Sequence, residues 1–186
     1  MAAEVLGESK DKEGREYSEA DLARLIGETT KYGAVHALFH LDAHGPDKEK
    51  VRALLVDYVY ALTREKGVLY CKGVVEEAID LAGTFSTAAE VQILAENFSV
   101  LHQLALKYGP IAIELRGPHK VVLDADQAQH VLLDASASMQ RFSAFIMEKV
   151  LSPEEKAKFQ EHLKRRAEFA GKVIEKSSEK PSGQSP

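Results

Sequence analysis

Three histidines spaced four residues apart are the side chains of this chain that come nearest to a chemical site. His36, His40 and His44 form an H-x3-H-x3-H series, and Asp42 lies among them. On a helix, this spacing would place all three imidazoles on one face, as in metal sites built from ligands at positions i and i+4. Such a cluster would bind a metal ion or a small ligand.

The segment that carries these histidines alternates like a half-buried strand. In residues 35–43 every odd position is apolar, whereas His36, His40 and Asp42 occupy even positions. Four residues along a strand span about 13 Å, which is too far for two imidazoles to share one ion. A site here would need a carboxylate from a neighbouring strand, and the residues that we predict for a ligand or metal are His36, His40, Asp42 and Glu90. The alternative is that the histidines lie on a solvated or partner-covered sheet face.

No arrangement of residues predicts a catalytic group, and we expect a protein that is not an enzyme. Glu90 and Glu114 could act as paired carboxylates across strands, but acidic residues on the outer face of an antiparallel sheet are usually solvated. Cys71 continues an apolar alternation and is expected to be a small buried side chain. The glycine patterns that bind nucleotide phosphates are missing from the sequence, so we predict no cofactor.

The composition predicts a globular cytoplasmic protein. Of the 186 residues, 45% are hydrophobic and 28% are charged, which is enough apolar material for a core. The single cysteine allows no intramolecular disulfide, which suits a reducing compartment. The sequence has no apolar run near the roughly 20 residues of a membrane span and no signal-peptide core. A net charge of -5 argues against a surface dedicated to nucleic acid.

The order of the expected elements indicates an α+β fold. A short helix beginning after Ser18 precedes strands at residues 35–43, 68–81, 88–95 and 111–116, with a helix after the first strand and another after the third. Gly73 is expected to mark a bulge or a close approach. The β-α-β-β-α-β order is that of the ferredoxin-like fold, here with an N-terminal helix and two C-terminal helices.

The first C-terminal helix, beginning after Asp124, has an apolar stripe that runs for about seven turns. Because this stripe is too long for one domain edge, it would have to cover the otherwise open sheet face or pair with the same helix of a second copy. Of these two arrangements, we predict the homodimer. The predicted interface residues are Val131, Ala135, Met139, Phe142, Phe145 and Ile146. We divide the chain into a flexible N-terminus (1–17), an α+β domain with its leading helix (18–123), a helical extension (124–176) and a disordered tail (177–186).

A basic cluster on the last helix suggests a different partner. RNA or the ribosome could be contacted by Lys164, Arg165 and Arg166. Acidic residues on the same helix favour instead a solvated face on which salt bridges form. The strands also lack the exposed aromatic pair with which a sheet stacks RNA bases. RNA or ribosome association is therefore an alternative to the leading hypothesis, and metal or metabolite binding on the histidine strand is another.

The layout of residues 73–117 resembles a known class of module. A hairpin leads into Ala-Glu-Val-Gln-Ile-Leu-Ala-Glu and then into Leu-Ala-Leu-Lys-Tyr-Gly-Pro-Ile-Ala-Ile-Glu-Leu, an order similar to that of the ligand-sensing and oligomerising modules of the ACT and Lrp-effector type. The resemblance implies a ferredoxin-like scaffold and carries over no binding residue. Residues 1–33 hold one short helix instead of a helix-turn-helix, which disfavours DNA reading. Our leading hypothesis is a non-enzymatic oligomeric interaction or regulatory protein.

Overall fold

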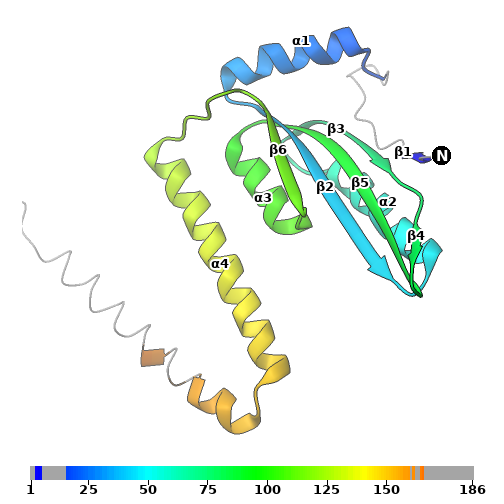
Figure 1. The fold of residues 1–186 in the computed structure, drawn as a ribbon. Coiled ribbons are helices and arrows are strands. Elements are labelled where there is room, and N and C mark those ends of the chain that lie inside the picture. Colours follow the sequence, from blue (N-terminus) through cyan, green and yellow to red (C-terminus); the bar gives the residue numbers. More distant parts are fainter. Residues whose placement is uncertain (1–2, 6–15, 160, 162–163, 166–186) are drawn as a thin grey trace, which may run out of the picture. The chain divides into compact units, whose positions relative to one another are not determined.

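The computed structural model describes residues 3–5, 16–159, 161 and 164–165 (Figure 1). The chain divides into two compact units, residues 1–135 and residues 136–186. Within the described residues, none of the helices is both long enough and apolar enough to cross a membrane.

The first unit confirms the predicted α+β class. It contains both helices and strands, and a short 3-10 helix, η1 (Thr30–Tyr32), lies between its first helix and the strand that follows. The strands are β1 (Ala3–Val5), β2 (Val35–Gly45), β3 (Val68–Val75), β4 (Ile79–Leu81), β5 (Thr84–Ala95) and β6 (Ala112–Gly117), and the helices are α1 (Glu19–Thr29), α2 (Lys48–Leu62) and α3 (Phe98–Tyr108).

All of these strands belong to one antiparallel sheet. The order across it is β1-β3-β5-β2-β6, and β4 pairs with β5 outside this path. The strand β2 therefore lies between β5 and β6. The strand β1 lies within the segment expected to be flexible, and it pairs with β3.

The prediction of one continuous strand over residues 68–81 was wrong. The structure has two strands there, β3 and β4, separated by residues 76–78. Both Ala82 and Gly83 have positive φ angles, 56° and 91°, which is the geometry of a tight two-residue hairpin. This turn pairs Leu81 with Thr84. The strand β4 therefore forms a hairpin with β5 and is not an extension of β3. Ile79 and Leu81 are exposed and do not continue the buried side of β3.

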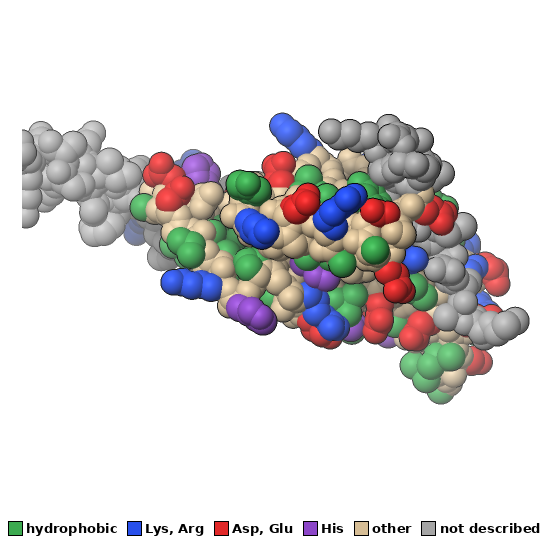
Figure 2. All heavy atoms as spheres, turned by 90° about the horizontal axis from the view of Figure 1, so that it is seen from above, with side chains coloured by type: hydrophobic (Ala, Val, Ile, Leu, Met, Phe, Trp, Pro, Cys, Tyr) green, Lys and Arg blue, Asp and Glu red, His purple; other side chains and the backbone are tan. Residues whose placement is uncertain are grey.

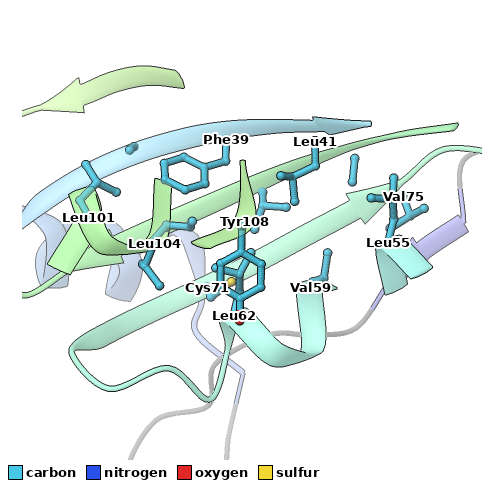
Figure 3. Close-up of a cluster of buried hydrophobic side chains, with 14 of the residues drawn as sticks. Phe39, Leu41, Leu55, Val59, Leu62, Cys71, Val75, Leu101, Leu104 and Tyr108 are labelled. Carbon is cyan, nitrogen blue, oxygen red and sulfur yellow. The ribbon is translucent and has the colours of Figure 1, made fainter. Parts of the chain in front are cut away.

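The main core lies between one face of the sheet and the helices α2 and α3. Figure 3 shows its side chains pointing toward one another from both layers. The sheet contributes alternate residues of its strands, as expected when one face is buried. Buried members include Phe39 and Leu41 of β2, Leu55, Val59 and Leu62 of α2, Cys71 and Val75 of β3, and Leu101, Leu104 and Tyr108 of α3.

Close approach of α2 to the sheet requires a glycine in β3. A Cβ atom at Gly73 would lie 2.6 Å from Cγ1 and 2.7 Å from Cγ2 of Val59. Apolar carbon atoms in contact are normally about 3.5–4.0 Å apart. Gly73 therefore marks a close approach, one of the two roles expected for it.

The helix α1 packs on the opposite face of the sheet. Tyr70 and Leu94 are paired across β3 and β5, and each alternates with residues that face the main core. They form a second buried cluster with Ala34, against which Leu22, Leu25 and Ile26 of α1 pack. The ring of Tyr17 meets that of Tyr70 edge-on at 5.7 Å. The helix α1 thus covers one end of this sheet face.

Polar side chains cap the starts of the helices α1 and α3. The side chain of Ser18 accepts a hydrogen bond from the backbone of Asp21 at the start of α1. Asn97 caps α3 in the same manner through Val100 N. Each cap satisfies a backbone donor that lacks a partner within its helix. The C-terminal residue of α3, Tyr108, donates its hydroxyl to Glu65, which follows α2, over 2.6 Å.

A long helix, α4 (Ala125–Val150), follows the sheet as predicted. At its start, Asp124 N donates to Gln127 Oε1 and Gln127 N donates to Asp124 Oδ1, and together the two hydrogen bonds form a capping box. Residues 153–159 are helical as well, after a second capping box between Ser152 and Glu155.

Candidate functional site

The polar side of β2 and of its neighbouring strands carries a group of histidine and carboxylate side chains. His36, His40 and Asp42 lie on the face opposite the main core, because Ala37, Phe39 and Leu41 on the other face are buried. Cross-strand pairing places Glu90 of β5 directly opposite His40. We refer to this set, together with Glu114 and Arg116 of β6, as the polar sheet face.

His40 lies between two carboxylates. Its Nε2 is 2.9 Å from Glu114 Oε1, and its Nδ1 is 3.8 Å from Glu90 Oε1. The hydrogen bond with His40 is the main reason why the pKa of Glu114 is lowered, and the charge of Arg116 adds to it. Arg116 itself lies 2.7 Å from Glu114 Oε2. His40, Glu114 and Arg116 therefore form one polar chain across β2 and β6.

His36 has a different environment. Its Nε2 is 2.9 Å from the amide nitrogen of Gln92 on β5. Burial lowers the pKa of His36, and the positive charge of Arg116 lowers it further. A neutral ring can accept the Gln92 hydrogen bond, whereas an imidazolium has no free lone pair. His36 is thus suited to a neutral, structural position beside the α1-covered end of the sheet.

Asp42 and His44 make a separate pair at the far end of β2. Their carboxylate and imidazole nitrogen are 2.6 Å apart. Of the four residues predicted for a ligand or metal, the structure thus brings together only His40 and Glu90. The predicted set lacks Glu114, the closer partner of His40. Glu114 and Glu90 do not pair directly, because β2 separates the two carboxylates and His40 is their common neighbour.

This geometry does not gather ligands around one point. The two carboxylates approach opposite nitrogens of the His40 ring, so one ion cannot bind both of them and a single ring nitrogen at once. No set of three or more His, Cys, Asp or Glu side chains in the described part of the chain is arranged to hold a metal ion. The polar sheet face can instead donate and accept hydrogen bonds to a polar molecule.

Cys71 is buried in the main core, as predicted. Burial raises the pKa of its thiol to about 12. The thiolate is the reactive form of cysteine. A thiol with such a pKa is protonated at neutral pH and is a packing residue.

The basic cluster on the last helix is only partly described. Lys164 and Arg165 are exposed, and Arg165 makes an i,i+4 ion pair with Glu161 at 2.6 Å. Arg166 lies outside the described residues. Figure 2 shows the molecule from above, and basic and acidic side chains are interspersed on the face that is visible there. An ion pair within the helix is the arrangement expected of a solvated face.

A pocket of about 300 Å³ lies within the first unit. Its walls include Lys31, Tyr32, Phe98 and Lys120, and none of its described lining residues is acidic. Two cations beside apolar walls suit a small anionic molecule. Sequence patterns do not predict this pocket, because its residues come from three separate segments.

Among the described residues, large apolar side chains are exposed on both β6 and α4. On β6, the side chains of Ile113 and Leu115 are 43% and 53% exposed. On α4, Met139, Phe142, Phe145 and Ile146 of the predicted interface are exposed, with Phe142 at 61%. Val131 is half-buried and Ala135 is exposed. Large apolar side chains grouped in this way commonly mark interaction sites.

Comparison with known proteins identifies a family. The model of the MJ0538 family matches residues 36–170, from β2 through α4 and beyond. Neither a curated protein nor a solved structure matches the chain. Because the family match spans nearly three quarters of the 186 residues, the chain belongs to the MJ0538 family.

Proposed function

We propose that this protein is a non-enzymatic, homo-oligomeric interaction protein in which α4 joins two copies. The observation that carries the proposal is the exposed apolar surface of α4. A helix that presents Met139, Phe142 and Ile146 to water leaves a large apolar area unburied. Association with another molecule would bury that area and release the water that it orders.

The spacing of these residues favours a second copy of the same helix as the partner. Apolar residues recur along α4 at alternating intervals of four and three, which averages the 3.5-residue repeat of a coiled coil. In an isologous dimer, the stripe of one copy packs against the same stripe of the other copy, so no different partner is needed. The residues of this α4 stripe are Ala128, Leu132, Ala135, Met139, Phe142 and Ile146.

The scaffold that we propose for this function is ferredoxin-like. The order β3-β5-β2-β6, with α2 and α3 packed on one face, supports that assignment. Oligomerisation is also what the resemblance to ACT and Lrp-effector modules implies. The single cysteine, buried and protonated, is consistent with our proposal of a cytoplasmic location.

A charge placed in the α4 stripe tests the proposal. We expect Phe142→Asp to weaken self-association by about 100-fold, because each copy loses an apolar contact worth about 1.5 kcal/mol and a dimer loses it twice. Analytical ultracentrifugation over a concentration series measures this change. The matched control is Gln140→Asp, which adds the same charge to an exposed position of the helix away from the stripe.

Three sedimentation results would count against this role of α4. Wild-type protein that sediments as a monomer at micromolar concentrations would refute the proposal. Equal dissociation constants for Phe142→Asp and wild type would also refute it. Equal weakening by both aspartate variants would show that added charge, and not loss of the stripe, causes the effect. Circular dichroism of each variant checks that α4 remains helical.

RNA or ribosome contact through Lys164, Arg165 and Arg166 stays a prediction. Reversal of these residues to glutamate should abolish co-sedimentation with ribosomes if the prediction holds. Metabolite binding on the polar sheet face also stays a prediction, and the carboxylates on either side of His40 are the feature that favours it. A thermal-shift panel of polar metabolites tests it.

A further inference from the structure

The strand β6 ends the sheet with one edge open. It pairs with β2 on one side, and no described strand pairs with it on the other. Natural proteins usually protect such edges, since unpaired backbone groups template pairing with another chain. Here the segment Ala112–Gly117 contains no proline, and its apolar residues Ile113 and Leu115 are exposed. The edge is therefore available for a further strand.

The faces of β6 limit how a second copy could add to this edge. Glu114 lies on the polar sheet face, and Ile113 and Leu115, which pair with the core-facing Phe39 and Ala37, lie on the other. The register with β2 shifts between Leu115 and Gly117, and Arg116, which falls at this shift, is placed on the polar side by its ion pair with Glu114. Antiparallel pairing of two identical strands about a two-fold axis keeps each face continuous, so residues of one face meet residues of the same face. The axis must then pass midway between one residue and the same residue of the other copy, and each choice of that residue gives a different set of cross-strand neighbours.

Charge selects one of these registers. An axis at Glu114 would set two glutamates directly opposite each other, which is destabilising. An axis at Ile113 would place both charges opposite uncharged residues. An axis at Leu115 places each Glu114 opposite the other copy's Arg116 and Leu115 opposite its own counterpart. Two opposite-charge pairs and one apolar pair then form together.

We infer that β6 is a self-complementary docking edge, through which two copies join their sheets antiparallel about Leu115. Each Glu114 exchanges its intrachain partner Arg116 for the Arg116 of the other copy. The polar sheet faces of the two copies become one continuous surface, with the His40 of each copy beside the junction through Glu114. The partner is thus a second copy of this chain.

This inference rests on the proposed self-association but uses a different surface. One pair of six-residue strands buries less than the roughly 1,200 Å² that stable interfaces usually reach. The β6 contact therefore adds to the contact that we assign to α4. A change in the β6 charges should weaken association and alter its register without touching the α4 stripe.

Charge reversals test the register directly. Glu114→Arg and Arg116→Glu each place like charges opposite each other, and we expect each to raise the dissociation constant about tenfold or more. The double variant Glu114→Arg/Arg116→Glu should restore wild-type association, because the swapped charges again face opposite signs. An equimolar mixture of the two single variants should form heterodimers. The control is Arg24→Glu, which reverses the charge of one member of an exposed ion pair on α1.

Analytical ultracentrifugation and native mass spectrometry of tagged mixtures provide the readouts. If both single reversals associate like wild type, the β6 inference is wrong. If Phe142→Asp then still disrupts association, the proposed role of α4 survives that failure. A wild-type chain that stays monomeric overturns both. Single reversals that weaken association without rescue by the double variant would overturn the Leu115 register.

Discussion

The contact between Gly73 and Val59 gives the sharpest stability prediction. Replacing Gly73 with alanine would put a methyl group 2.6 Å from Val59 Cγ1, so α2 or β3 must move by about 1 Å to reach normal contact distance. Overpacking of this kind costs about 1–3 kcal/mol. The smaller entropy of the unfolded alanine-containing chain returns about 0.4–1 kcal/mol. We therefore expect Gly73→Ala to reduce the free energy of unfolding by about 1–2 kcal/mol.

A double-mutant cycle isolates this contact. Val59→Ala alone should cost about 2–3 kcal/mol, since it removes two buried methyl groups and leaves a cavity. In that background the methyl group introduced by Gly73→Ala fills part of the vacated space. The double variant should therefore be more stable than the sum of the two single effects by about 1–2 kcal/mol.

Urea denaturation followed by circular dichroism measures all four proteins. They should be compared at one protein concentration, because self-association adds to apparent stability. The urea m-value should stay constant if only the native packing changes. Additive effects of the two substitutions, or a Gly73→Ala variant as stable as wild type, would show that α2 and β3 do not meet as closely as the structure indicates.

Two further predictions concern titratable and hydrogen-bonded groups. Burial and the charge of Arg116 lower the pKa of His36 in the folded protein, so the unfolded chain binds the proton of His36 more readily than the folded chain does. The free energy of unfolding should therefore lose nothing to His36 above about pH 6.5, and it should fall as the pH drops from there toward the pKa of His36 in the folded protein. NMR titration should show Arg116→Gln raising the pKa of His36, and a wild-type value at or above about 6.5 would contradict this reasoning. Tyr108→Phe should cost about 1–2 kcal/mol in urea denaturation, because Glu65 loses the hydroxyl donor. An unchanged denaturation midpoint would mean that solvent replaces that donor at no cost.

Much of the fold followed from local signals in the sequence. The alternation over residues 35–43 identified β2, and capping residues such as Ser18 and Asp124 identified helix starts. Such features depend on near neighbours in the chain. The strand β4 did not follow, because Ile79 and Leu81 fit the buried alternation of β3 as well as they fit a hairpin arm. Only the turn geometry distinguishes the two.

The candidate site was harder to predict. Pairing of His40 with Glu90 could be foreseen from two adjacent alternating strands. The role of Glu114 could not, because it depends on β6 joining the free side of β2 after a separation of 74 residues in the chain. The pocket beside Lys31 and Lys120 depends on loops that no periodic pattern describes.

The position of β2 has a consequence for the order in which the molecule can assemble during synthesis. Both strands that flank β2, namely β5 and β6, are translated after it. A nascent chain that has reached only α2 therefore carries an apolar strand of the core with neither edge paired. Folding must wait for contacts far apart in sequence, which are slow to form. Until Ala112–Gly117 leaves the ribosome, β2 keeps an open edge that can mispair with another chain; pairing with β6 then closes this edge of β2, and the open edge of the sheet becomes that of β6.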